Sequence, residues 1–349
     1  MGELSDAQLR EIFRQRIRPQ FDRTGSFTHA ESAPTVVLLG GQPGSGKSRA
    51  VGRVKAQYPG IVPVVGDDLR AYHPDYDRLM REDPLSMPRE TGQAASRWAR
   101  MAMEYLREQR RSALVETTLR QPDMVREVVT EFRRAGYRIE LRVVAVPLEV
   151  SRLGTIARYA DQVERSGAGR WAVSTVHDTA AAAVPGTTSD VVRDGMIDHV
   201  TIESRQGEVY LETSLRPQQW TSAALDVRQA IDAAREPERL PAAEARAWLV
   251  TATTSVQTCV RSGQSDSDLL ATVGRMVDRD APRVARAAYP VDERAQRQAL
   301  ERLREANRPL AKRALGHRIN AEVRRRGDSN GRDVTLGRDG PTPGRSRGR

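Results

Sequence analysis

The sequence of 349 residues contains one cysteine, Cys259, and no apolar segment that approaches the roughly 18 residues of a membrane-spanning helix. An internal disulfide is therefore excluded, and a lone thiol is typical of a reducing compartment. Residues 1–6 are acidic and lack the basic and apolar regions of a secretory signal. An aspartate at position 6 also breaks the myristoylation pattern. We therefore expect no membrane association.

Lysine is also scarce, because Lys47, Lys55 and Lys312 stand beside 53 arginines. A single arginine therefore indicates a binding site only where a motif surrounds it. The formal net charge is +10, and residues 301–349 contribute +8 of it, from 14 basic and 6 acidic side chains. The first 300 residues are thus nearly neutral. Nucleic acid is an unexpected partner for this core, whereas the basic C-terminal tail could bind it.

Residues 35–48 have the most specific pattern in the chain. The apolar residues 36–39 predict a short buried strand that runs into a glycine-rich turn. The turn spells G-x-x-x-x-G-K-S, the phosphate-binding loop (P-loop), in Gly41, Gln42, Pro43, Gly44, Ser45, Gly46, Lys47 and Ser48. Glycines let backbone N–H groups face phosphate oxygens, and the next helix presents its positive end to the same anion. We expect Lys47 to bind the β- and γ-phosphates of ATP and Ser48 to bind Mg²⁺.

Strand and helix patterns alternate to about residue 197. Further strands are predicted at residues 61–65, 114–116 and 138–146, with helical spacing of apolar residues between them. Residues 199–211 predict a β-hairpin around Gly207. The alternation predicts a P-loop kinase-like three-layer α/β fold with a largely parallel sheet. Ligands of such sheets bind at the carboxyl ends of the strands.

The composition changes on both sides of this region. Residues 1–33 predict an N-terminal helix and a linker, and residues 34–213 predict the kinase domain. Residues 214–326 are rich in Ala, Arg, Glu and Gln and predict a helical extension. Its expected helices are 222–235, 242–260, 265–280, 291–308 and 310–326. Residues 327–349 are nearly devoid of apolar side chains and predict a disordered basic tail. We expect truncation near residue 215 to leave a folded kinase.

Acidic side chains follow two predicted strands at the edge where the P-loop lies. Asp67 and Asp68 come directly after the second strand, and Glu116 ends the third. One aspartate could accept a proton from a substrate hydroxyl, or it could cap a helix. Glu116 could orient the substrate or a water molecule on Mg²⁺, or it could form an ion pair in the core.

Arg158 and Arg170 are candidates for binding the transferred phosphate. Arg158 lies off the apolar arc that Leu153 and Ile156 define on their helix, so it points away from the core. Arg170 follows a glycine-rich break at residues 166–169, where a lid could move. Each arginine could equally be an ordinary solvated charge.

Four segments resemble the zeta-toxin family and occur in the order of that family. They are residues 38–48, 66–74, 115–118 and 153–159. The last, Leu-Gly-Thr-Ile-Ala-Arg-Tyr, is the most specific, and the resemblance spans about residues 34–213. It implies a bacterial, cytoplasmic kinase that acts as a toxin and uses ATP and Mg²⁺. Family members phosphorylate the 3′-hydroxyl of the sugar in UDP-N-acetylglucosamine, and an antitoxin protein is an implied partner.

The resemblance also implies roles for individual residues. It implies Asp67 as the base, Lys47, Arg158 and Arg170 on the phosphates, and Ser48 on Mg²⁺. The predicted residues on the acceptor side are Glu116, Thr118, Arg120 and Glu104. The chain departs from the family at residues 117–119, which are Thr-Thr-Leu instead of Gly-Thr-Gly. It also has Arg100 where the family has a carboxylate, one turn before Glu104.

Three functions are consistent with these features. The first is an ATP-dependent kinase of zeta-toxin type that phosphorylates UDP-N-acetylglucosamine. The second keeps the fold and phosphorylates another nucleotide, such as NAD, or an antibiotic. The third is a nucleotide-binding regulatory protein whose basic tail engages nucleic acid or a secretion system. We expect the first, because the resemblance to the zeta-toxin family implies it, and because Gly41, Asp67 and Glu116 all fall at the carboxyl ends of predicted strands, as an active site requires.

Overall fold

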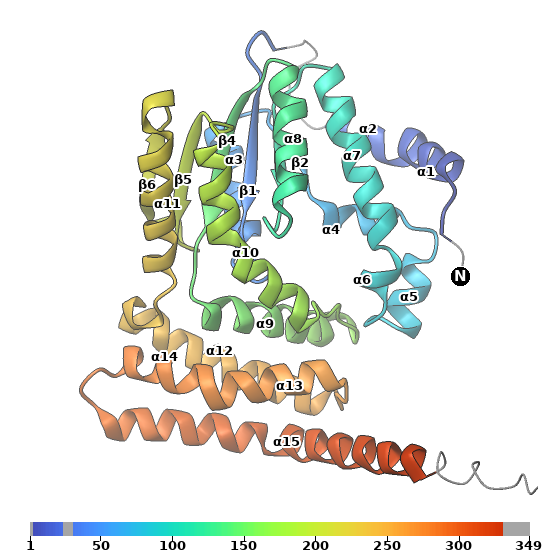
Figure 1. The fold of residues 1–349 in the computed structure, drawn as a ribbon. Coiled ribbons are helices and arrows are strands. Elements are labelled where there is room, and N and C mark those ends of the chain that lie inside the picture. Colours follow the sequence, from blue (N-terminus) through green and yellow to red (C-terminus); the bar gives the residue numbers. More distant parts are fainter. Residues whose placement is uncertain (1–2, 24–30, 331–349) are drawn as a thin grey trace, which may run out of the picture.

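The computed structural model describes residues 3–23 and 31–330, and its centre is a six-stranded sheet (Figure 1). The strands lie in the order β2-β3-β1-β4-β5-β6. Strands β1 to β5 are parallel, and β6 pairs antiparallel with β5. Their bounds are β1 Thr35–Gly40, β2 Val62–Val64, β3 Ala113–Glu116, β4 Arg138–Val144, β5 His199–Glu203 and β6 Val209–Ser214. The prediction of an α/β fold with a largely parallel sheet is confirmed.

Alternate side chains of β1 enter two different cores. Val36 and Leu38 belong to the core under α7, α8 and α10, whereas Val37 and Leu39 pack with α3 on the opposite face. These helices span α3 Lys47–Gln57, α7 Gly92–Glu108, α8 Pro122–Arg134 and α10 Ser174–Arg193. A strand covered on both faces has no polar side, which is why the sequence shows an unbroken apolar run here.

Several short helices pack around α7. The N-terminal helix begins with the predicted capping box, in which Ser5 and Gln8 bond each other's backbone. It packs on α7, where Trp98 Nε1 donates to the carbonyl of Leu9 at 3.0 Å. The bounds of these elements are α1 Asp6–Ile12, η1 Phe13–Ile17, α2 Arg18–Arg23, α4 Gly66–Leu69, η2 Arg70–Tyr72, α5 Tyr76–Glu82 and α6 Met87–Glu90. Among the described residues, no helix is both long and apolar enough to cross a membrane.

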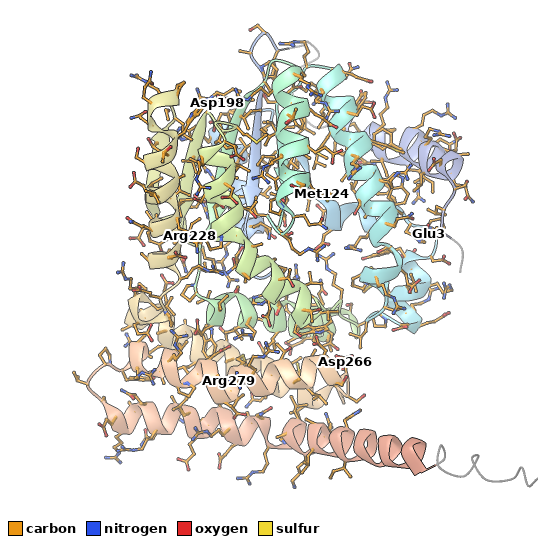
Figure 2. The ribbon with its side chains drawn as sticks, viewed as in Figure 1. Glu3, Met124, Asp198, Arg228, Asp266 and Arg279 are labelled. Carbon is orange, nitrogen blue, oxygen red and sulfur yellow. The ribbon has the colours of Figure 1, made fainter. Side chains whose placement is uncertain are left out.

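The C-terminal helices form a second core together with one helix of the α/β region. They lie below the sheet, next to α9 (Figure 1). Side chains fill this layer near Asp266, which caps α13 by accepting a hydrogen bond from the N–H of Leu269 at 2.8 Å (Figure 2). Helix α9 spans Leu148–Ser166, and the C-terminal helices of this core are α12 Ala242–Arg261, α13 Ser267–Arg275, η5 Met276–Asp280, α14 Ala281–Ala288 and α15 Glu293–Asn330. Helix α11 Trp220–Ala234 belongs instead to the core on the α10 side of the sheet, and the short helices η3 Pro217–Gln219 and η4 Pro237–Arg239 precede and follow it.

Two predictions for the extension are wrong. The expected helices 291–308 and 310–326 are one helix, α15, with Pro309 inside it. Proline removes one backbone hydrogen bond, but Leu303 and Leu310 are buried in the same core on either side of it and hold the helix together. Helix α14 was not expected; it continues α13 and η5 without a break, and the π-helical turn of η5 lies directly before its Pro282.

The predicted domain boundaries stay predictions. Most of the predicted linker and the tail beyond residue 330 lie outside the described residues. Within the described chain, α11 packs on α10, and α12 packs on α9. The helical extension is thus in contact with the kinase region along much of its length, which bears on the truncation expected above.

Truncation after residue 215 is now expected to give a chain that does not fold cooperatively. Removing the extension would expose Leu153, Ile156 and Trp171, which are buried in the second core, at a cost of about 1.5–3 kcal/mol for each large side chain. Circular dichroism melts of the full chain and of residues 1–215 test this. A truncated chain that unfolds in one sharp transition near the full-length Tm would contradict it.

Candidate active site

The P-loop connects β1 to α3 through glycines in unusual conformations. Gly41, Gly44 and Gly46 have φ angles of 146°, 78° and 105°. Only glycine adopts such angles without steric cost, so the spacing of glycines in the sequence specifies the turn. The loop therefore leaves β1 at its carboxyl end and delivers Lys47 and Ser48 to the first turn of α3.

The P-loop lies directly on α9, backbone against backbone. A Cβ atom placed on Gly154 would lie 2.3 Å from the carbonyl oxygen of Gly44, and one placed on Gly44 would lie 2.0 Å from that of Ser151. Neither position accepts a side chain unless the backbone moves. Gly154 thus permits this contact. Arg158 lies one turn after Gly154 on the same helix.

Lys47 is buried at the centre of the site. Its Nζ donates to the carbonyls of Gly41 at 2.7 Å and Gln42 at 3.2 Å, and it lies 3.6 Å from Oε1 of Glu116. Burial lowers the pKa of Lys47, and Arg158 lowers it further, while Glu116 and Asp67 oppose the shift. The ammonium group is thus held by carbonyls that phosphate oxygens could replace.

Three arginines surround Asp67. Its Oδ1 accepts a hydrogen bond from Arg70 Nε at 3.0 Å, and its Oδ2 lies 3.4 Å from Arg170 Nη2 and 3.9 Å from Arg158 Nη1. Burial alone would raise the pKa of Asp67, but Arg170, Arg70 and Arg158 outweigh it and hold the pKa below its usual value. Asp67 is therefore ionised at neutral pH.

Asp68 points elsewhere. It is exposed and lines a small pocket with Ile17, Phe21 and Tyr72, next to the N-terminal helices. Neither aspartate caps α4, because the N-cap of that helix is Val65 and accepts no side-chain bond. The capping alternative is thus excluded for both.

Arg158 and Arg170 converge on one point from two segments. Arg158 comes from α9, and Arg170 follows Gly167, which ends α9 in the left-handed conformation. The N–H of Arg170 donates to Oε1 of Gln162 at 3.0 Å, which folds this segment back over the helix. The Nε atoms of both arginines are buried without a hydrogen-bond partner. Two unsatisfied donors next to a P-loop indicate a site for an anion.

The predicted acceptor residues are only partly brought together. Glu116 lies beside Lys47, and Thr118 and Arg120 follow it in a partly buried loop. Glu104 is exposed near the C-terminal end of α7, and among the described residues no hydrogen bond or ion pair links it to Glu116. Thr91, at the opposite end of α7, bonds Arg70 instead. The role of these side chains therefore stays a prediction.

The departure from the family at residues 117–119 has a visible consequence. Leu119 has φ 53°, a left-handed conformation that is uncommon for leucine. Its side chain is fully buried against Gly40, where an added Cβ would lie 2.3 Å from Leu119 Cδ1. Arg100, the second departure, lies 3.8 Å from Glu127 in an exposed ion pair. The first departure changes the backbone next to the acceptor side, and the second lies on the surface.

Two arginines of the site were missed by sequence reasoning. Arg70 lies three residues after Asp67, and this helical spacing could have identified it. Arg205 lies in the turn after β5, and a Cβ on Gly46 would lie 2.6 Å from its Cγ. Within the described chain, no hydrogen bond or ion pair engages its guanidinium group. Burial lowers the pKa of Arg205, as does neighbouring Arg49. Nothing in the sequence distinguishes Arg205 from the other arginines.

The donor atoms fit a magnesium ion bound together with a nucleotide. The described residues contain no cluster of three or more His, Cys, Asp or Glu side chains. Mg²⁺ at phosphate sites takes few protein ligands, because substrate phosphates and water supply the rest. The exposed Ser48 at the start of α3 is the residue that would hold it.

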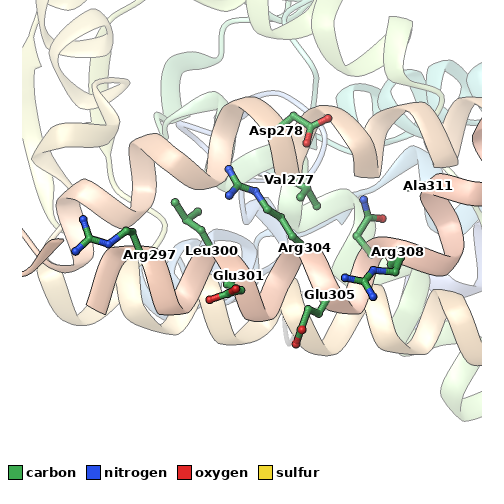
Figure 3. Close-up of a pocket in the computed structure, with 10 residues that line it drawn as sticks. Val277, Asp278, Arg297, Leu300, Glu301, Arg304, Glu305, Arg308 and Ala311 are labelled. Atoms are coloured by element: carbon green, nitrogen blue, oxygen red, sulfur yellow. The ribbon is translucent and has the colours of Figure 1, made fainter. Parts of the chain in front are cut away.

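A surface hollow in the helical extension does not belong to this site. It lies between η5 and α15 and is lined by charged side chains of both signs around Val277 and Leu300 (Figure 3). Its residues all come from the helical extension. The P-loop, Asp67 and the arginines therefore define the candidate active site without it.

Known sequences match the chain over the α/β region. The family described as Zeta toxin matches residues 20–214. The chain is 27% identical over 206 residues to "Toxin zeta" of Enterococcus hirae, which covers 58% of this chain and 72% of that protein. It is 32% identical over 130 residues to "Toxin PezT" of Streptococcus pneumoniae serotype 4, which covers 37% of this chain and 51% of that protein.

A solved structure shares the fold. It comes from a characterisation of the PezAT chromosomal toxin–antitoxin system of Streptococcus pneumoniae. The TM-score is 0.56 at 23% sequence identity, and the match covers 66% of this chain and 89% of that chain. The predicted P-loop kinase-like fold is therefore confirmed.

Proposed function

The chain belongs to the zeta toxin family, and we propose that it is an ATP-dependent kinase that phosphorylates a sugar hydroxyl of UDP-N-acetylglucosamine and thereby acts as a toxin. One observation carries the proposal. Lys47, Glu116 and the Asp67–Arg158–Arg170 cluster meet at the carboxyl edge of the sheet, beside a P-loop. This arrangement supplies cations for a phosphoryl group and a carboxylate for a hydroxyl proton.

The P-loop and its neighbours would bind the donor. ATP phosphates would replace the carbonyls of Gly41 and Gln42 as partners of Lys47. Arg205, which lies against Gly46, and its neighbour Arg49 would add positive charge to this side of the loop, although Glu244 partly offsets the charge of Arg205. Ser48 would hold Mg²⁺, which would neutralise part of the phosphate charge when bound.

Asp67 would act as the general base. In the nucleotide-free chain its proton affinity is low, because three guanidinium groups stabilise the carboxylate. When phosphates attract Arg158 and Arg170, the pKa of Asp67 would move back toward its ordinary range. The base would then gain proton affinity when the donor is bound, which limits futile reaction with water.

Glu116, Thr118, Arg120 and Glu104 are the proposed acceptor-side residues. Glu116 carries this assignment furthest, because it lies within 3.6 Å of Lys47 and therefore close to the transferred phosphate. An antitoxin protein is the proposed partner, and the bacterial cytoplasm is the proposed location. Both come from the family alone.

A panel of acceptors tests the proposal. The full chain is incubated with Mg-ATP and separately with UDP-N-acetylglucosamine, other nucleotide sugars, NAD and aminoglycosides, and product masses are measured. A mass gain of one phosphate on UDP-N-acetylglucosamine is the expected result. Phosphorylated NAD or antibiotic would overturn the acceptor and keep the kinase. ATP binding without any product would favour a regulatory protein.

Replacing either clamp arginine is expected to affect turnover more than binding. Arg158→Ala and Arg170→Ala should each lower kcat by about 10³-fold or more, the loss typical of arginines that stabilise phosphoryl transfer, with little change in ATP affinity. Single-turnover rates and ATP titrations separate the two effects. An arginine whose replacement leaves kcat near that of the unmodified chain is a surface charge.

A further inference from the structure

A chain of hydrogen bonds leads from the P-loop to the helical extension. Gln42 Nε2 donates to Ser151 Oγ at 3.3 Å, and Ser151 Oγ lies 2.9 Å from His177 Nε2. On the other side of the ring, His177 Nδ1 lies 2.8 Å from Asp178 Oδ1. Arg275 of α13 donates to Asp178 Oδ2 at 2.6 Å. We call these five residues the Gln42–Arg275 chain.

One arrangement of protons satisfies every bond of the Gln42–Arg275 chain. A carboxylate only accepts, so neutral His177 donates its Nδ1–H to Asp178 and accepts the Ser151 hydroxyl at Nε2. The lone pairs of that hydroxyl remain free for the amide of Gln42. Burial lowers the pKa of His177, although Asp178 opposes the shift, so the neutral ring is favoured. Hydrogen bonds that point the same way strengthen one another.

The Ser–His–Asp order does not make Ser151 a nucleophile. Ser151 is fully buried beneath the P-loop, and His177 is 2% exposed. Its hydroxyl also lies 3.1 Å from the carbonyl of Leu148 in the same helix. A substrate cannot reach Ser151 Oγ. These side chains therefore stabilise the P-loop above them.

Gln42 links the chain of hydrogen bonds to the P-loop and to Lys47. Its carbonyl accepts hydrogen bonds from Lys47 Nζ and from the N–H of Ser45, both at 3.2 Å. Among the residues that the structure describes, its side chain bonds only Ser151 Oγ and the carbonyl of Val146, both at 3.3 Å. The position of Gln42 therefore fixes both the turn of the loop and the resting place of the lysine.

We propose that α13 of the helical extension holds the P-loop in its nucleotide-binding shape through the Gln42–Arg275 chain. Ser151, His177, Asp178 and Arg275 are positioning residues for the ATP site, and the extension is a working part of that site. The inference rests on the proposed ATP binding. A buried ion pair between Arg152 of α9 and Asp280 of η5 lies beside the chain, and Arg152 Nη2 also lies 3.7 Å from Asp178 Oδ1.

The test is made in the full chain with Arg275→Gln and Ser151→Ala. Arg275 is a third exposed and Ser151 loses one oxygen, so both variants are expected to fold. Calorimetric titration with Mg-ATP should show affinity weakened by about 3- to 30-fold, the range of couplings carried through packed networks. The KM for ATP should rise by the same factor, while kcat at saturating ATP stays within about twofold.

Arg283→Gln is the matched control. Arg283 also belongs to the extension and binds a carboxylate of α9, Glu149 Oε1, at 2.7 Å, but it is not in the Gln42–Arg275 chain. It should change Tm about as much as Arg275→Gln and leave ATP affinity unchanged. Equal ATP affinity for Arg275→Gln and the unmodified chain overturns the inference, and so does equal weakening by Arg283→Gln. An unmodified chain that binds no ATP overturns the proposed function itself.

Discussion

Lys47→Ala is expected to abolish phosphotransfer and to leave the chain folded. Lys47 is the one lysine of the P-loop, and in the proposed complex its Nζ would lie beside the phosphates, where negative charge develops during transfer. Removing a single preorganised hydrogen-bond donor from such a position lowers the rate by about 10²–10³-fold. Removing a full positive charge is expected to lower it further. Product mass measured over hours should show no transfer above background.

The fold is expected to survive this change. Burial disfavours the charged form of Lys47, so its removal relieves a desolvation cost while leaving Glu116 partly exposed to water. Lys55→Ala, an exposed lysine of the same helix, is the control and should keep full turnover. If the protein is a toxin, cells should tolerate Lys47→Ala and not Lys55→Ala. Unchanged turnover in folded Lys47→Ala would refute the assignment.

The sequence predicts those parts of the site that local patterns specify. Glycine spacing sets the P-loop, and strand ends place Asp67 and Glu116 at one edge, because parallel strands align their carboxyl ends. The helical arc of residues 150–157 correctly turns Arg158 away from the core. These inferences need only neighbours in the chain.

The remaining features depend on residues far apart in the chain. Gln42 reaches Arg275 only through α9 and α10, and Arg205 reaches Gly46 only because β5 ends beside the P-loop. The left-handed Leu119 has no signature in a single sequence. Pro309 shows the opposite case. The sequence predicts a helix end at this proline, but core packing on either side of it keeps the helix continuous.

Asp67→Asn is expected to lower turnover by about 10²–10⁴-fold, the usual cost of losing a general base. Asparagine keeps the shape and can still accept a hydrogen bond from Arg70, but it cannot take the substrate proton. It also removes the negative charge that competes with phosphates for Arg158 and Arg170. ATP affinity should therefore stay the same or increase, which separates this variant from one that damages the P-loop.

Asp68→Asn is the neighbouring control and should keep turnover within a few-fold. Its side chain lines the pocket with Phe21 and Tyr72, and burial raises its pKa although the charge of Arg170 opposes the shift; among the described residues no ion pair joins it to the arginines. Adjacent residues that differ this much test the geometry directly, because both substitutions remove one carboxylate from the same short helix. If Asp68→Asn is inactive and Asp67→Asn is active, the base is Asp68. The Asp67–Arg158–Arg170 cluster would then be a structural ion network, and its arginines would no longer be expected to act on the phosphates.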